Sequence, residues 1–118
     1  MLKKGLIVAA TAVFAILFFL DGAYKLIAPG SDQAMFARYG FAPWFVIVFG
    51  LVEVLGALAL LPRRLAPLAA AVLAVLMLGG AAVFVLHRDY PLAAAHLCFA
   101  IVLAALGLAR RPRRAVAL

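Results

Sequence analysis

Long apolar runs separated by short polar breaks make up most of the chain. Four of these runs have about the 20 residues that an α-helix needs to cross a bilayer. They cover approximately residues 6–28, 43–61, 66–86 and 92–109. We therefore expect an all-α fold, an integral membrane four-helix bundle in up-down-up-down order. The whole chain, residues 1–118, is then a single transmembrane domain.

The connections between the runs differ in length. Residues 31–42 form a polar connection in which Met35, Phe36 and Tyr39 recur with rough helical spacing. This spacing favours a short amphipathic helix at the membrane interface, and a structured loop is the alternative. The later turns, at residues 62–64 and 87–91, are short enough to make their flanking helices antiparallel neighbours.

Charge and composition restrict the class of protein further. Hydrophobic residues make up 70% of the chain and its mean hydropathy is +1.25, which excludes an ordinary soluble domain. The net charge is +7, but the basic residues gather in three stretches that an even number of spans brings to one side. These residues are Lys3, Lys4, Arg63, Arg64, Arg110, Arg111, Arg113 and Arg114. The positive-inside rule then places both termini in the cytoplasm. The expected partner of this charge is the lipid bilayer with its anionic headgroups, and not nucleic acid.

Glu53 lies in the middle of the second apolar run, where an ionisable group costs several kcal/mol unless it is paired, protonated or hydrated. At about 1.5 Å per residue, Asp21 and His96 lie about 9 Å nearer the outer surface than Glu53. Lys25 lies about 15 Å above Glu53, beyond direct contact, and His87 lies near the outer boundary. We therefore expect Glu53 to be mostly protonated at neutral pH and to face a polar interior cavity.

All five of these ionisable residues fall in the outer half of the predicted bundle, which predicts a polar pocket that opens outward. Glu53 and His96 are the candidate catalytic residues, as proton acceptor and as donor or relay. Asp21, Lys25 and His87 are the candidate ligand-binding residues, and Asp21 and Lys25 can pair because they are four apart. Structural roles are open for each: Lys25 and His87 can reach the interface, and His96 and Glu53 can bond between helices.

Other kinds of site find little support. Cys98 is the single cysteine, so the chain has no internal disulfide and no Cys-x-x-Cys pair. Acidic and histidine side chains are suitable metal ligands, but no single helix carries a Glu-x-x-His pair. We predict no metal site.

Several of these residues lie in short motifs that resemble the DoxX-like family of small four-helix membrane proteins. The resemblance is carried by Gly22-Ala-Tyr-Lys25-Leu-Ile with Pro29, by Gly50-Leu-Val-Glu53-Val-Leu-Gly56, and by a third run that ends at His87. Some members of that family are similar to a subunit of a thiosulfate:quinone oxidoreductase. The resemblance implies a subunit or accessory of a membrane redox system in the bacterial cytoplasmic (inner) membrane. It also implies a small or quinone-like ligand, and a homo-oligomer or a larger membrane complex.

Two other function classes remain open, and the residues leave open whether the chain is an enzyme. Small multidrug-resistance transporters have a similar length and helix number, but their essential glutamate lies in the first helix. Here the first helix carries Asp21 and the glutamate is Glu53, on the second. A proton-coupled exporter is therefore the second hypothesis. A non-catalytic subunit that packs its Ala- and Gly-rich helices against other spans is the third.

Overall fold

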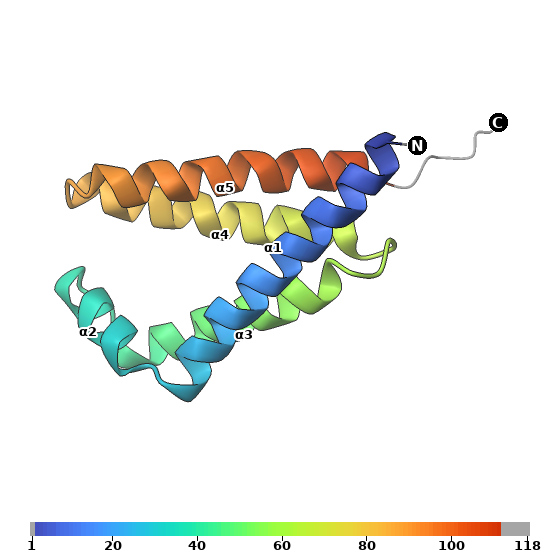
Figure 1. Ribbon diagram of the computed structural model, residues 1–118. Coiled ribbons are helices and arrows are strands. Elements are labelled where there is room, and N and C mark those ends of the chain that lie inside the picture. Colours follow the sequence, from blue (N-terminus) through green and yellow to red (C-terminus); the bar gives the residue numbers. More distant parts are fainter. Residues whose placement is uncertain (1, 112–118) are drawn as a thin grey trace.

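The structure, a computed structural model, describes residues 2–111. The predicted contacts of Arg113 and Arg114 with headgroups lie outside the described residues. Within this part of the chain there are helices and no strands, so the all-α prediction is confirmed (Figure 1). The helices are α1 (Leu2–Ile27), α2 (Gly30–Arg38), α3 (Pro43–Ala59), α4 (Ala66–Leu86) and α5 (Tyr90–Ala109).

Three of the described helices, α1, α4 and α5, are long and apolar enough to cross a membrane by themselves. Helix α3 has 17 residues, and it makes a fourth candidate span together with α2, to which it is bent by 116°. The described residues thus contain three or four candidate spans, and the prediction of a multi-pass membrane protein is confirmed. The connection over residues 31–42 is largely helical, as α2, rather than a loop.

Local signals explain where these helices begin and end. A proline stands in the first turn of α3, α4 and α5, where its missing N–H removes no intrahelical hydrogen bond. The side chain of Asp89 accepts a hydrogen bond from the Leu92 backbone N–H at the start of α5. Gly40 follows α2 with a φ of +88°, a conformation that strongly favours glycine. The sequence therefore marks the helix boundaries closely.

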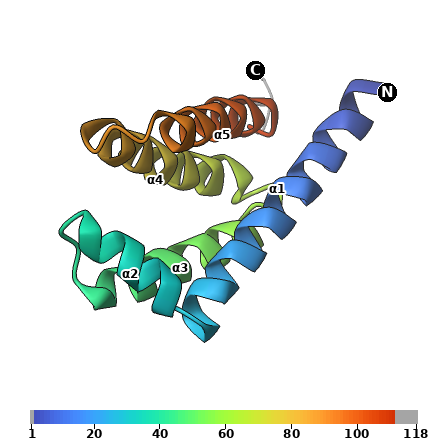
Figure 2. The same ribbon diagram turned by 60° about the vertical axis from the view of Figure 1, so that its left-hand side comes forward.

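The helices pack as two antiparallel pairs. Helix α1 lies along α3, and α4 lies along α5, whereas contacts between the pairs are few. The pairs meet near the α3–α4 turn and diverge toward the opposite end (Figures 1 and 2). The short turn thus holds α3 and α4 together only near the turn itself. Helix α2 folds across the wide end, where the Tyr39 ring contacts those of Phe84, at 5.6 Å, and His87, at 4.4 Å.

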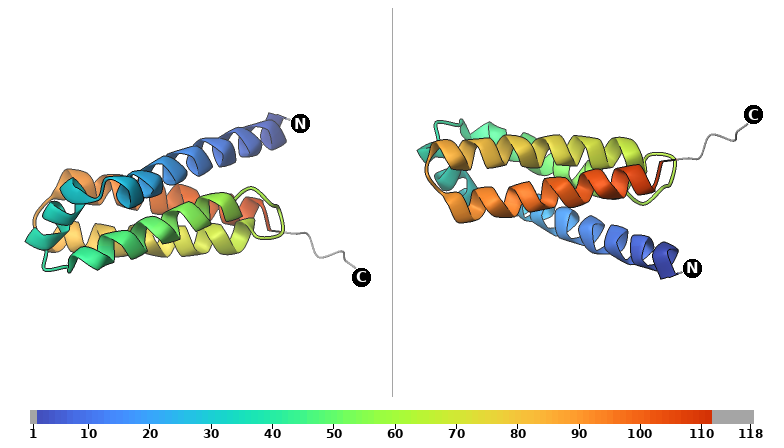
Figure 3. Two further views of the ribbon diagram at one scale, coloured as in Figure 1. Left: turned by 90° about the horizontal axis from the view of Figure 1, so that it is seen from below. Right: turned by 90° about the horizontal axis from the view of Figure 1, so that it is seen from above.

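A close-packed core joins the two pairs at the narrow end. Leu60, Leu73 and Leu103, from three different parts of the chain, are fully buried there. Arg110 donates hydrogen bonds to the carbonyl oxygens of Leu60, at 2.7 Å, and Leu61, at 3.1 Å. The start of α1, the α3–α4 turn and the end of α5 lie at this same end (Figure 3). The basic residues of the described chain that were expected on one side therefore lie at one end of the molecule.

Candidate functional site

The site begins with a close crossing of α1 and α3. A Cβ atom on Gly22 would lie 2.6 Å from the carbonyl oxygen of Gly50, and a Cβ atom on Gly50 would lie 2.8 Å from Lys25 Cβ. Real side chains do not approach so closely, so this crossing requires a glycine at both positions. Small residues allow such close approach of helices in a membrane, where apolarity alone gives no drive for association.

The crossing brings three ionisable side chains together. Lys25 Nζ lies 2.5 Å from Asp21 Oδ2 and 3.0 Å from Glu53 Oε1. The side chains of Lys25 and Glu53 are 7% and 1% exposed, whereas that of Asp21 is 56% exposed. We call Asp21, Lys25 and Glu53 the ion cluster. The expected pairing of Asp21 with Lys25 is present.

The expected separation of Lys25 from Glu53 was wrong. It assumed upright helices whose depths could be counted from their ends. The crossing instead places Lys25 beside Gly50, only three residues, or about 4.5 Å of rise, from Glu53. The expectation of a mostly protonated Glu53 rested on burial without a nearby cation. The burial is present and a cation is also present, so the protonation state of Glu53 stays a prediction.

Lys25 and Glu53 lie within the distance of an ion pair. Glu53 Oε1 is buried and has no hydrogen-bond partner among the described residues, although Lys25 Nζ is within 3.0 Å. The same ammonium lies 5.3 Å from the centre of the Phe49 ring, within the range of a cation–π interaction. The ammonium is thus held by two carboxyl groups and one aromatic ring.

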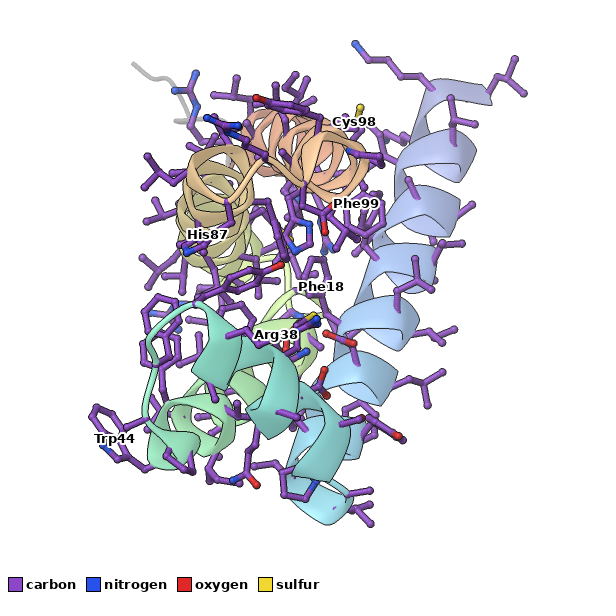
Figure 4. All side chains as sticks on the ribbon, turned by 90° about the vertical axis from the view of Figure 1, so that its left-hand side faces the viewer. Phe18, Arg38, Trp44, His87, Cys98 and Phe99 are labelled. Atoms are coloured by element: carbon purple, nitrogen blue, oxygen red, sulfur yellow. The ribbon has the colours of Figure 1, made fainter. Side chains whose placement is uncertain are left out.

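A cavity of about 1190 Å³ lies between the two helix pairs, beside α2, and the ion cluster forms part of its wall. Its remaining surface is mostly aromatic and aliphatic. The aromatic side chains come from all five helices and from the loop before α3; those of phenylalanine are Phe18, Phe36, Phe41, Phe45, Phe49, Phe84 and Phe99. Figure 4 shows Phe18 and Phe99 between α1 and the α4–α5 pair, whereas Trp44 points away from the interior. This aromatic lining was not predicted from the sequence, although the frequency of phenylalanine was visible in it.

His96 lines the cavity from α5. Its Nδ1 atom lies 2.9 Å from the carbonyl oxygen of Leu92, one turn earlier on the same helix. The ring centre lies 4.9 Å from that of Phe84 on α4. The structural alternative for His96, a hydrogen bond between helices, is not what the structure has: the bond lies within α5.

His87 is placed differently from the other candidates. It is exposed at the end of α4, is not among the residues that line the cavity, and contacts Tyr39. The structure thus brings Asp21, Lys25, Glu53 and His96 to one cavity and leaves His87 outside it. Asp32, on α2, also lines the cavity and was missed, because nothing in the sequence indicated that α2 folds back over the site.

The donor set of the site favours an organic ligand over a metal ion. Among residues 2–111, no three His, Cys, Asp or Glu side chains converge as metal ligands would. Lys25 also occupies the space between Asp21 and Glu53 that a cation would need. An apolar cavity with a few polar groups at one wall is the usual form of a site for a small organic molecule.

The motifs at this site agree with a comparison to known families. The profile of the DoxX-like family matches residues 9–109. The chain belongs to the DoxX-like family. No curated protein and no solved structure shows significant similarity to it. The match covers every residue of the ion cluster and His96, so the site lies within the region that defines the family.

Proposed function

We propose that this DoxX-like protein binds a small, lipid-soluble, quinone-like ligand in its cavity, as a subunit or accessory of a membrane redox system. It acts in the bacterial cytoplasmic membrane as a single transmembrane domain, with both termini in the cytoplasm and the cavity facing outward. The gathering of basic residues at the narrow end, where the start of α1, the α3–α4 turn and the end of α5 lie, supports this orientation.

The observation that carries the proposal is a buried ion cluster in the wall of an aromatic cavity. The cavity of about 1190 Å³ is large enough for a ring with an isoprenoid-like tail. Aromatic side chains favour offset or edge-to-face contacts with such a ring. The ion cluster and His96 then supply the few polar contacts that orient its oxygen atoms. In this arrangement Glu53 accepts a proton, and His96 relays one.

The charge of the cavity restricts the ligand further. Three carboxyl side chains line it, those of Asp21, Asp32 and Glu53, against the single ammonium of Lys25. Like charges repel strongly where the surroundings are apolar. The cavity therefore disfavours anions, including sulfur oxyanions, and favours a neutral or cationic molecule.

Two neighbouring alanines allow a direct test of the proposal. Ala95 lines the cavity, whereas Ala94 is exposed on α5 and does not line it. Binding of a short-chain para-quinone and of its quinol would be measured for the protein in lipid nanodiscs. We expect Ala95→Trp to weaken binding at least about tenfold by filling the cavity, and Ala94→Trp to leave it unchanged. Equal binding by both variants would show that the ligand does not occupy the cavity.

Proton-coupled export of lipophilic cations is the second candidate. The same cavity combines aromatic rings, which attract cations, with an excess of carboxyl groups. Addition of a lipophilic cation to the purified protein should then release protons, and Glu53→Gln should abolish the release. If a broad panel of cations releases no protons, this candidate is excluded.

Assembly into a homo-oligomer or a larger membrane complex is part of the proposal. Purification from native membranes in a mild detergent, followed by mass spectrometry of the proteins and lipids that co-purify, would identify the partners. A chain that is always monomeric and without partners would exclude the purely structural role.

A further inference from the structure

The hydrogen bond of His96 defines which of its nitrogen atoms is free. The Leu92 carbonyl oxygen can only accept, so the contact of 2.9 Å places a hydrogen on Nδ1. In the neutral ring, Nε2 is then an acceptor. No described residue donates a hydrogen bond to it, and His96 lines the cavity. We infer that the second nitrogen is available to a ligand, because His96 is among the residues that line the cavity.

The packing around His96 holds the ring in this orientation. A Cβ atom on Gly80 would lie 2.8 Å from His96 Cδ2 and 3.5 Å from Nε2, so the imidazole fills the space that the glycine leaves. The Phe84 ring, 4.9 Å away, limits its movement on another side. Three contacts on two helices thus fix the direction of Nε2, as a specific binding group requires.

The rest of the polar lining combines the carboxyl groups of Asp21, Asp32 and Glu53, which only accept when ionised, with the hydroxyl groups of Tyr24 and Tyr39, which can donate or accept. The ammonium of Lys25 is already engaged by Asp21 and Glu53 and is 7% exposed. Asp21 is exposed and is among the residues that line the cavity, and Asp32 adds another carboxyl group. A ligand with a hydroxyl group can therefore donate to a carboxyl group as well as to His96.

We propose that the cavity binds the hydroxyl-bearing, reduced form of its ligand in preference to the carbonyl form, and that His96 is the residue that distinguishes them. This inference rests on the proposed quinone-like ligand. A phenolic O–H donates to His96 Nε2, whereas a carbonyl oxygen in the same place leaves two acceptors facing each other. Because the two forms have nearly the same size, the difference in affinity comes from the hydrogen bond.

The test compares three ligands that share one six-membered ring and side chain on the wild-type protein in nanodiscs, under anaerobic conditions. The ligands are a short-chain para-quinone, its quinol, and the dimethyl ether of that quinol, which retains the ring but has no O–H group. We expect the quinol to bind about tenfold more tightly than the other two. His96→Phe should bring the ratio of quinol to quinone affinity close to one, and His96→Gln should restore part of the preference.

The outcomes separate this inference from the function on which it rests. Equal binding of quinol and quinone, or tighter binding of the quinone, would overturn the preference while leaving the quinone-like ligand in place. A preference that persists in His96→Phe would overturn the role of His96. If neither form binds, the proposed function itself fails, and the inference fails with it.

Discussion

The Lys25 ammonium lies 3.0 Å from Glu53 Oε1, although the two residues come from helices separated by α2. The contact exists because Gly22 and Gly50 let α1 and α3 cross with backbone against backbone. One ammonium there faces the carboxyl groups of both Asp21 and Glu53. The stability of the helix pair and the polarity of the cavity thus depend on the same crossing.

Removing the cation should destabilise the protein more than removing the whole pair. Lys25→Met leaves Glu53 buried without its counter-ion, and we expect a loss of about 3–5 kcal/mol in the free energy of unfolding. Lys25→Met combined with Glu53→Gln should recover part of that loss, because no buried charge remains unpaired. Unfolding in mixed micelles of the wild-type protein, Lys25→Met, Glu53→Gln and the double variant measures the interaction energy between the two side chains. Additive effects would show that the 3.0 Å contact carries no interaction energy.

Replacement of a glycine by alanine should lower the stability of the protein at the helix crossing and raise it where the glycine faces open space. Gly22→Ala forces a Cβ atom against the Gly50 carbonyl and should cost about 1–3 kcal/mol of stability. Gly5→Ala, in the same helix, meets nothing within 4 Å and should gain up to about 1 kcal/mol from helix propensity. Thermal unfolding in detergent compares them. A neutral Gly22→Ala variant would mean that the helices do not cross at this point.

Arg110 should stabilise the narrow end through its two hydrogen bonds to the carbonyl oxygens of Leu60 and Leu61, just after α3. Its loss leaves the carbonyl oxygens of Leu60 and Leu61 without these donors, so Arg110→Ala should cost about 1.5–3 kcal/mol. Arg64→Ala removes an exposed arginine from the neighbouring turn and is the matched control for charge. Both variants would be unfolded by denaturant in the same micelles. Equal destabilisation would attribute the effect to charge and not to the bonds.

Tyr39 should hold α2 over the wide end of the cavity. Its ring contacts those of Phe84 and His87, and aromatic pairs contribute about 0.5–1.5 kcal/mol each. Tyr39→Ala should therefore speed amide hydrogen exchange in α2 about two- to tenfold, with little change in α4. Tyr90→Ala, at an exposed tyrosine of α5, provides the control. Unchanged exchange in α2 would show that other contacts hold it.

The helices themselves were predictable because their signals are local. Apolar runs of bilayer length, the prolines at Pro43, Pro67 and Pro91, and Gly40 after α2 act within a few residues of where they stand. The pairing of Asp21 with Lys25 was predictable for the same reason, since a spacing of four residues places both on one face. Glu53 was recognisable as a candidate because a carboxylate within an apolar run is costly in any arrangement.

The sequence by itself thus determined the all-α membrane class, the helix boundaries and most of the candidate residues. Only the tertiary structure decided that Lys25 reaches Glu53, that His87 stays outside, and that the helix pairs diverge around an aromatic cavity. The physical reason is that the tilt and crossing point of a helix depend on contacts between residues far apart in the chain. Gly22 and Gly50 are 28 positions apart, and no local pattern in either segment specifies that they meet.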